Sequence, residues 1–231
     1  MIVVENLQKI YGANVALDLE KLELNQGETI GLIGNNGAGK TTFFRLMLDL
    51  IKANNGKVLS KDKNVKKSEH WKNYTSAHLD ENFLIDFLTP REYFSFIAGL
   101  RKVEKNDLNI FLEKYEEFLG SEILVQKKYI REFSKGNKQK IGIIAALIGL
   151  PEIIILDEPF ANLDPTSQFR LKNILKEIGD ETLLIISSHD LNHITEICTR
   201  IVVLEKGKLV YDIERSEDTL EKLKEHFAVE A

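Results

Sequence analysis

Short runs of apolar, β-branched residues alternate along this chain with longer stretches in which apolar residues recur at helical spacing. Three of the short runs come first, at 2–4, 15–24 and 30–33. The third run stops at a glycine-rich loop, and the apolar residues of 42–51 then fall three or four positions apart. This pattern predicts a strand, a loop and a helix in that order. A turn at 54–56 is expected to close the helix, with another strand beginning near 58–59.

The pattern changes in the middle of the chain. From 88 to 150 it becomes helical and rich in phenylalanine, with a Thr-Pro helix start at 89–90 and an amphipathic run over 108–119. We interpret this stretch as an inserted helical subdomain.

A second α/β region follows. Strands are predicted at 153–156, 183–187, 201–204 and 208–211. Helices over 167–178 and 191–198 lie between them, which indicates a mixed sheet with crossover connections, and a charged helix is predicted at 217–227. We expect a single domain over 1–231 made of an α/β core (1–87 and 151–215), a helical subdomain (88–150) and a C-terminal helix (216–231).

Composition limits the classes of function. The 36 acidic and 31 basic residues give a net charge of −5, so no overall positive field favours nucleic acid or anionic lipid. Cys198 is the only cysteine, which excludes an internal disulfide and fits a reducing compartment.

No segment of the sequence has the character of an export signal or a membrane span. The first residues lack the basic start and apolar run of a secretory signal. The most apolar stretch, 141–156, is interrupted by Pro151 and Glu152 into pieces shorter than the roughly 20 residues that a bilayer requires. We therefore expect any membrane role to need a partner chain.

The strongest chemical signal is the glycine-rich loop, which satisfies the pattern G-x-x-x-x-G-K-[ST] between a predicted strand and a predicted helix. Glycines allow backbone N–H groups to converge on phosphate oxygens, Lys40 supplies a positive charge, and the Thr41 hydroxyl can bind Mg²⁺. A glycine turn with a solvated lysine is the alternative. The expected phosphate-binding residues are Gly34, Asn35, Asn36, Gly37, Ala38, Gly39, Lys40, Thr41 and Thr42.

An apolar run that ends in two acids supplies the groups that the loop lacks. The predicted strand 153–156 is followed by Asp157, which can hold Mg²⁺, and by Glu158, which can polarise an attacking water. Alone this signal is weak, because buried strands often end in carboxylates. Together with the phosphate loop it predicts nucleotide hydrolysis.

With these motifs in order, the sequence resembles the ATP-binding-cassette (ABC) ATPases over nearly its whole length. Residues 133–137 (Phe-Ser-Lys-Gly-Asn) resemble the signature loop of that family. The resemblance implies that Ser134 and Gly136 contact the γ-phosphate held by a second subunit. It also implies a P-loop NTPase fold of the ABC ATPase type, with a mixed-sheet α/β core, N-terminal antiparallel strands and an inserted helical subdomain.

Three further segments extend the resemblance. Asn162 and Asp164 match the loop that contacts the other subunit, His189 matches a switch histidine, and Tyr11 matches the aromatic residue that stacks on adenine.

Each of these assignments has a simpler alternative. Tyr11 can instead pack between strands, and Ser134 can be only a helix cap. His189 and His193, four residues apart, invite a metal-binding interpretation, although no third ligand is evident.

Two departures from the family pattern affect the site. The stretch 77–82 contains no glutamine where the family has one, so Asp80 or Glu81 is the nearest match and a further candidate for Mg²⁺. The signature loop carries Lys135 and Asn137 in place of glycine and glutamine. Both changes resemble cassettes that pair with separate export-type membrane subunits.

Phenylalanine is concentrated in the middle of the chain. Most of these rings should form the core of the helical subdomain, but Phe83 or Phe87 can line a groove for a short helix of a membrane subunit. The seven positions, out of twelve phenylalanines in all, are Phe83, Phe87, Phe94, Phe96, Phe111, Phe118 and Phe133.

The resemblance implies an ATPase that uses ATP and Mg²⁺ to power an ABC transporter, with export the expected direction. Its expected partners are a separate transmembrane permease and a second ATPase subunit, which can be identical or different. No nucleic-acid partner is expected. The expected location is cytoplasmic, at the membrane through the permease. The alternatives are a soluble ABC ATPase acting on ribosomes or DNA, or a non-hydrolysing regulator, which Asp157 and Glu158 argue against.

Overall fold

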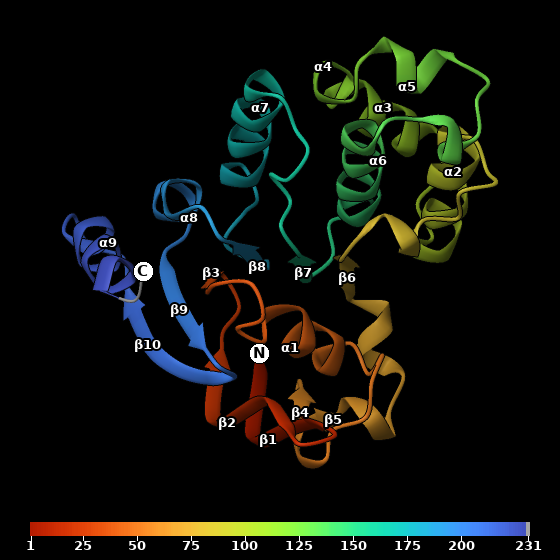
Figure 1. Ribbon diagram of the computed structural model, residues 1–231. Helices are drawn as coiled ribbons and strands as arrows, with labels where there is room; N and C mark the ends of the chain where they lie inside the picture. Colours follow the sequence, from red (N-terminus) through yellow and green to blue (C-terminus); the bar gives the residue numbers. More distant parts are fainter. Residues whose placement is uncertain (230–231) are drawn as a thin grey trace.

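The computed structural model describes residues 1–229, which form two sheets that pack together and a group of helices at one end (Figure 1). The smaller sheet is antiparallel and has the order β2-β1-β4-β5. Its strands are β1 (Ile2–Tyr11), β2 (Asn14–Leu24), β4 (Asn55–Ser60) and β5 (Lys63–Asn64).

The larger sheet has the order β10-β9-β3-β8-β7-β6 and is parallel except for β10, which pairs with β9 in the antiparallel sense. Its strands are β3 (Thr29–Ile33), β6 (Thr75–His78), β7 (Ile153–Leu156), β8 (Leu183–Ser188), β9 (Arg200–Glu205) and β10 (Lys208–Glu214).

The helices fall into two groups. Those beside the sheets are α1 (Lys40–Met47), α7 (Pro165–Lys176), α8 (Leu191–Ile197) and α9 (Thr219–Val229). The others form the helical group of Figure 1: α2 (Pro90–Arg101), α3 (Lys105–Lys114), α4 (Glu116–Leu119), α5 (Ser121–Val125) and α6 (Lys135–Leu147). Short 3₁₀ turns complete the chain at Val65–Lys67, His70–Asn73, Glu81–Phe83 and Ile130–Glu132.

The central strands are buried on both faces, which explains their uninterrupted apolar runs. In β7, Ile153 and Ile155 face the core shared with the small sheet and α1, whereas Ile154 and Leu156 face the core shared with the helical group. Because consecutive side chains of a strand point to opposite faces, one four-residue strand contributes to two cores.

The predicted mixed sheet, with N-terminal antiparallel strands and an inserted helical subdomain, is confirmed. The predicted C-terminal segment 216–231 includes residues 230–231, which lie outside the described residues. None of the helices within 1–229 combines the length and the apolarity that a bilayer span requires.

Two local predictions were wrong. The turn at 54–56 does not close the first helix, which ends at Met47, because Asn55 and Gly56 begin β4 beside a bulge in β1. Gly56 has φ 76°, and a β-carbon there would lie 2.1 Å from the carbonyl oxygen of Asn6. The amphipathic run 108–119 is two helices rather than one, separated at the buried Tyr115.

Gly31, in the middle of β3, should be intolerant of a side chain. A β-carbon there would lie 2.1 Å from Cγ2 of Ile194 and 3.1 Å from Sγ of Cys198. We expect Gly31→Ala to lower the free energy of unfolding by about 1–3 kcal/mol, measured by urea denaturation, because α8 must shift. The control is Gly99→Ala in α2, where no atom lies within 4 Å of the added carbon. There the substitution should stabilise by about 0.5–1 kcal/mol. Unchanged stability in Gly31→Ala would contradict this account of the contact between β3 and α8.

Candidate nucleotide-binding and catalytic site

The loop between β3 and α1 encloses one side of a cavity of about 330 Å³. All the residues expected to bind phosphate line it except Gly34, whose carbonyl oxygen accepts a hydrogen bond from Lys40. The lining residues are Asn14, Val15, Ala16, Asn35, Asn36, Gly37, Ala38, Gly39, Lys40, Thr41, Thr42, Asp157, Glu158 and Lys206.

Two glycines let this loop pass between neighbouring strands. A β-carbon on Gly34 would lie 2.3 Å from the carbonyl oxygen of Leu204, and one on Gly39 would lie 2.7 Å from that of Ala16. Gly39 also has φ 109°, a conformation that side chains rarely adopt. The backbone therefore fits against β2 and β9 only with glycine at these positions.

Positive charge gathers where the loop enters α1. Lys40 is only 7% exposed, and its ammonium lies 3.5 Å from Oε1 of Glu158. The first turn of α1 contains no acidic residue, so the positive end of the helix dipole and its free N–H groups face the loop. These features suit the phosphates of a nucleotide.

Asp157 is buried between α1 and β8. The Thr41 hydroxyl donates to Oδ2 of Asp157 at 2.7 Å, and the Ser187 hydroxyl donates to Oδ1. Burial raises the pKa of Asp157, while these two hydrogen bonds act in the opposite direction by stabilising the carboxylate.

The oxygen atoms of Thr41 and Asp157 fit Mg²⁺, which binds hard oxygen ligands. Within residues 1–229 there is no cluster of three or more acidic, histidine or cysteine side chains that can hold a metal by itself. This donor set matches the usual mode of Mg²⁺ binding, in which one or two protein groups act together with substrate phosphates.

Glu158 faces the same cavity with a different environment. Its Oε2 lies 2.8 Å from Nδ1 of His189, and Oε1 faces Lys40. The backbone of Glu158 has φ 48°, and its N–H donates to the Ser187 hydroxyl at 2.8 Å. This carboxylate is 28% exposed, so it can reach a water molecule near a bound phosphate.

The two histidines of the alternative metal interpretation have different partners. His189 faces Glu158, whereas His193 stacks on Phe160 with 4.3 Å between ring centroids and lies 3.6 Å from Asp190. The structure therefore pairs His189 with Glu158, which lines the cavity, rather than with His193 at a shared metal site.

Tyr11 is exposed at the end of β1, with 48% of its surface accessible and the Lys9 ammonium 4.7 Å from its ring centroid. The alternative that it packs between strands is wrong. Its strand partner, Asn14, lines the cavity with Val15, which places the ring on the same hairpin as the cavity wall.

The signature segment and the 162–164 segment contact each other on the exposed surface of the chain. Ser134 caps α6, its hydroxyl accepting from the N–H of Asn137 at 3.3 Å, so the cap interpretation describes a real contact. A β-carbon on Gly136 would lie 2.6 Å from the carbonyl oxygen of Asn162. Asp164 caps α7 through the N–H and hydroxyl of Ser167. None of these residues lines the cavity formed by Lys40.

Asp80 and Glu81 point toward different elements. Oδ2 of Asp80 lies 3.9 Å from Arg45 on α1, whereas Oε2 of Glu81 lies 3.4 Å from Lys138 on α6. Neither is among the residues that line the cavity.

The sequence interpretation missed two residues that hold the acidic pair. Ser187 bridges Asp157 and the backbone of Glu158, and Gln139 donates to the carbonyl oxygen of Glu158 at 3.2 Å. Ser187 had a usable signal, because it is the last residue of the predicted strand 183–187, close before His189. The position of Gln139 depends on how α6 packs, which local sequence does not specify.

Comparison with known proteins identifies the class that this fold and site define. Residues 17–161 match the family model described as ABC transporter. The chain is 35% identical over 227 residues to an uncharacterized ABC transporter ATP-binding protein of Nostoc sp., covering 91% of this chain and 65% of that protein. It is 34% identical over 221 residues to the bacitracin transport ATP-binding protein BcrA of Enterococcus faecalis, covering 94% of this chain and 70% of BcrA. The chain thus spans about two thirds of the length of these relatives.

The fold is similar to a dimeric post-hydrolysis structure of the ATP-binding cassette MJ0796 bound to ADP and Pi, with a TM-score of 0.82 and 20% identity over 94% of this chain and 99% of that one. The chain belongs to the ABC transporter family, in which it is an ATP-binding domain of the ABC ATPase type.

The hydrogen bond from Ser187 to Asp157 predicts a pH-dependent loss of stability in Ser187→Ala. Losing a donor to the buried carboxylate should cost about 1.5–3 kcal/mol when Asp157 is ionised. The pKa of Asp157, already raised by burial, should rise further in the variant. Ionisation in the folded state then becomes less favourable, so the deficit relative to wild type should grow as pH rises from about 4 to 7. Chemical denaturation of both proteins at several pH values measures this difference in the free energy of unfolding.

The matched control is Ser188→Ala, since Ser188 is also buried but its hydroxyl accepts from a backbone N–H, that of Asp190, at 3.0 Å. Its effect should not change with pH over this range. Equal deficits at pH 4 and 7 in Ser187→Ala would contradict the assigned contact with an ionised Asp157.

Proposed function

We propose that this chain binds Mg-ATP and hydrolyses ATP to drive an export-type ABC transporter. The observation that carries the proposal is the convergence of Lys40, Asp157 and Glu158 on one cavity beside a glycine loop. Matches to relatives named as ABC transporter ATP-binding proteins support the transport role.

Each side chain at the cavity has a distinct role in this proposal. Lys40 and the N-terminus of α1 neutralise the β- and γ-phosphates. Thr41 and Asp157 would hold Mg²⁺, which would supply positive charge to the phosphate oxygens. Glu158 accepts the proton of the attacking water, and His189, which faces that carboxylate, holds the γ-phosphate. Tyr11 stacks on the adenine ring.

A second cassette, identical or different, completes the site. Ser134, Asn162 and Asp164 are exposed and Gly136 is partly exposed, and none of them lines this chain's own cavity. We infer that they contact the nucleotide of a partner cassette, so that two chains enclose two ATP molecules. ATP binding then closes the dimer and hydrolysis releases it.

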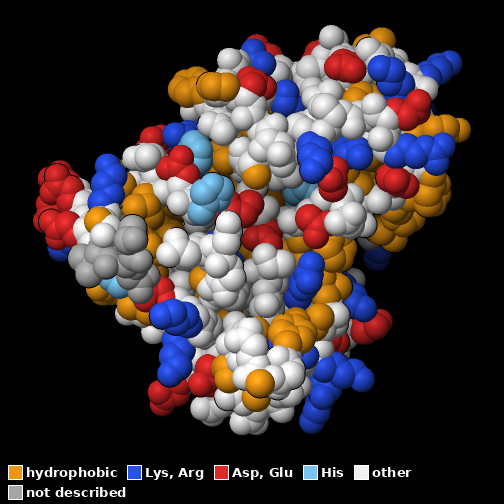
Figure 2. Space-filling view, viewed as in Figure 1, with side chains coloured by type: hydrophobic (Ala, Val, Ile, Leu, Met, Phe, Trp, Pro, Cys, Tyr) orange, Lys and Arg blue, Asp and Glu red, His pale blue; other side chains and the backbone are white. Residues whose placement is uncertain are grey.

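A cleft of about 510 Å³ between β6, α2 and α6 supports docking of a permease. Phe83 lines it together with Leu100 and Ile97, and Phe83 is 48% exposed. Figure 2 shows hydrophobic side chains gathered along this flank, where Phe87 is also exposed. The cleft combines these apolar side chains with polar ones such as Lys72 and Arg101, a mixture that suits a short amphipathic helix. We infer that a membrane permease places such a helix here, which would hold the chain at the cytoplasmic face of the membrane.

The proposed division of the chain follows the order of its helices and strands. We assign the nucleotide-binding core to 1–87 and 151–215, the subdomain that carries the signature loop to 88–150, and the C-terminal helix to 216–231. The positions of α2 to α6, all within 88–150, support this division. Asp80 or Glu81 in place of glutamine, and Lys135 and Asn137 in the signature loop, support the export type by resemblance.

Glu158→Gln tests the proposed function. The change keeps the size of the side chain and removes the base, so hydrolysis should slow by about 10²–10⁴-fold while ATP still binds. The variant should accumulate as a dimer with Mg-ATP, measured by size-exclusion chromatography alongside phosphate release. Glu113→Gln, at an exposed carboxylate on α3, is the control and should behave as wild type. Hydrolysis by Glu158→Gln at the wild-type rate would rule out Glu158 as the base.

Asp80 is the better candidate for the role of the missing glutamine, because it lies beside Arg45 in the last turn of α1, the helix that carries Lys40 and Thr41, whereas Glu81 lies beside α6. A carboxylate that approaches the phosphates when the nucleotide binds would be attracted by Mg²⁺ and repelled by the γ-phosphate. We expect Asp80→Asn to change the Mg²⁺ concentration that gives half-maximal turnover, and Glu81→Gln to leave it unchanged. The reverse result would assign the role to Glu81, and no change in either variant would make this loop an ordinary connection.

A further inference from the structure

The backbone of Glu158 is held from both sides by side chains that do not enter the nucleotide cavity. Its N–H donates to Ser187 at 2.8 Å, and its carbonyl oxygen accepts from Nε2 of Gln139 at 3.2 Å. Glu158 has φ 48°, a conformation that residues other than glycine rarely adopt. The two hydrogen bonds therefore fix the direction in which its carboxylate leaves the main chain.

Gln139 is itself held at its other end by His78. Oε1 of Gln139 lies 3.2 Å from Nε2 of His78, and both side chains are buried. Since the amide nitrogen of Gln139 donates to Glu158, the amide oxygen must accept, so Nε2 of His78 carries the proton. Burial lowers the pKa of His78, in agreement with a neutral ring.

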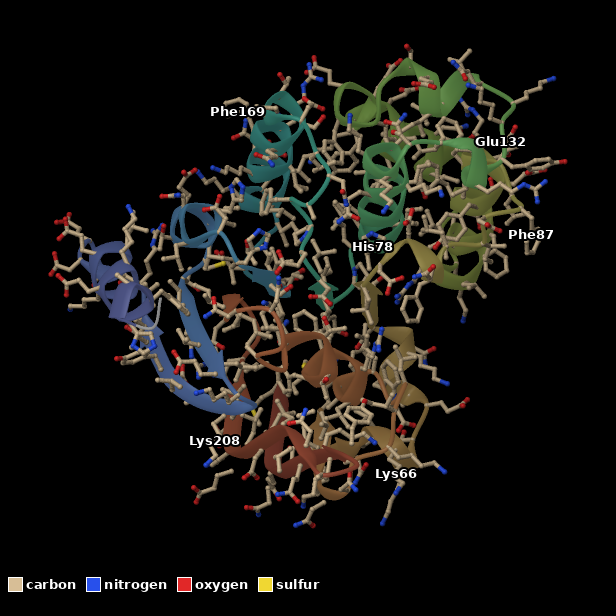
Figure 3. All side chains as sticks on the ribbon, in the orientation of Figure 1. Lys66, His78, Phe87, Glu132, Phe169 and Lys208 are labelled. Carbon is tan, nitrogen blue, oxygen red and sulfur yellow. The ribbon has the colours of Figure 1, made fainter. Side chains whose placement is uncertain are left out.

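His78 connects this pair to the docking cleft. It ends β6 beside α6 (Figure 3), and it lines the cleft of about 510 Å³ together with Gly142 of α6. A β-carbon on Gly142 would lie 2.1 Å from Cε1 of His78, so the ring fills the space that a side chain would need. Movement of β6 relative to α6 must therefore displace this ring.

We propose that His78 and Gln139 are positioning residues for ATP hydrolysis, which fix the backbone of Glu158 from the floor of the docking cleft. The proposal rests on the role of Glu158 as the base. Neither residue lines the nucleotide cavity; the connection runs from His78 through the amide of Gln139 to the carbonyl oxygen of Glu158. A partner that shifts β6 or α6 would thereby change the position of the base.

The test compares Gln139→Met and His78→Leu, each of similar size and without the hydrogen bonds, in single-turnover hydrolysis by the full chain with Mg-ATP. A displacement of about 1 Å can reduce a rate about 10²-fold, so we expect a decrease of about 10–100-fold in the hydrolysis rate. The Kd for Mg-ATP should stay within about twofold of wild type, because the phosphate loop is untouched.

Two further variants separate positioning from a general structural role. His78→Gln should recover most of the rate, because its amide can place an N–H near the position of Nε2. The double variant His78→Leu with Gln139→Met should be no slower than the slower single variant, because each substitution breaks the same chain of hydrogen bonds to Glu158. Ser60→Ala is the control for loss of a buried polar group, since Ser60 lies in the small sheet and its hydroxyl accepts a hydrogen bond from Tyr74. This variant should hydrolyse ATP as wild type does.

Glu158→Gln is measured in the same series. If it hydrolyses ATP at the wild-type rate, the proposed function itself is wrong. If it is slow while His78→Leu and Gln139→Met match wild type, only the positioning role is wrong. The role is also overturned if the single variants are slow but weaken ATP binding in parallel, if His78→Gln gives no recovery, or if the two effects add.

Discussion

The carboxylate of Asp157 is buried at the end of β7, and the geometry of the whole site depends on how its charge is compensated. Removing an ionised carboxylate from water is costly unless hydrogen bonds replace the solvent. One replacement comes from Thr41 at the start of α1 and the other from Ser187 near the end of β8. Meeting this requirement brings the ends of three elements together, and the phosphate loop is attached to one of them.

The neighbouring carboxylates of Asp157 and Glu158 lie in very different surroundings. Asp157 is 6% exposed, whereas Glu158 turns into the left-handed region and directs a partly exposed carboxylate between Lys40 and His189. One acid is held by fixed hydroxyl groups, and the other is open to solvent. Two adjacent carboxylates can therefore serve different purposes, because their surroundings differ.

Close contacts form the interface between the large sheet and the helical subdomain. The Arg101 guanidinium, at the end of α2, donates to the backbone carbonyl of Asn73 at 3.0 Å and to that of Thr75. The ring of His78 fills the space beside Gly142. The docking cleft lies between these contacts, so a partner bound there would act on the same elements that hold the backbone of Glu158.

Residues close together in the chain determined much of this protein. The phosphate loop between a strand and a helix, the acidic pair after β7 and the inserted helical subdomain all follow from short patterns, because spacing and glycine chemistry act over a few residues. The turn proposed at 54–56 was wrong, since Gly56 serves a contact with Asn6 on another strand.

The tertiary structure alone decided which distant side chains meet. It placed Ser187 on Asp157, aligned His78 and Gln139 with the backbone of Glu158, and directed Asp80 to α1 and Glu81 to α6. These contacts join residues that lie far apart in sequence, and their geometry depends on the packing of whole strands and helices. No local pattern of hydrophobic and polar residues specifies that packing.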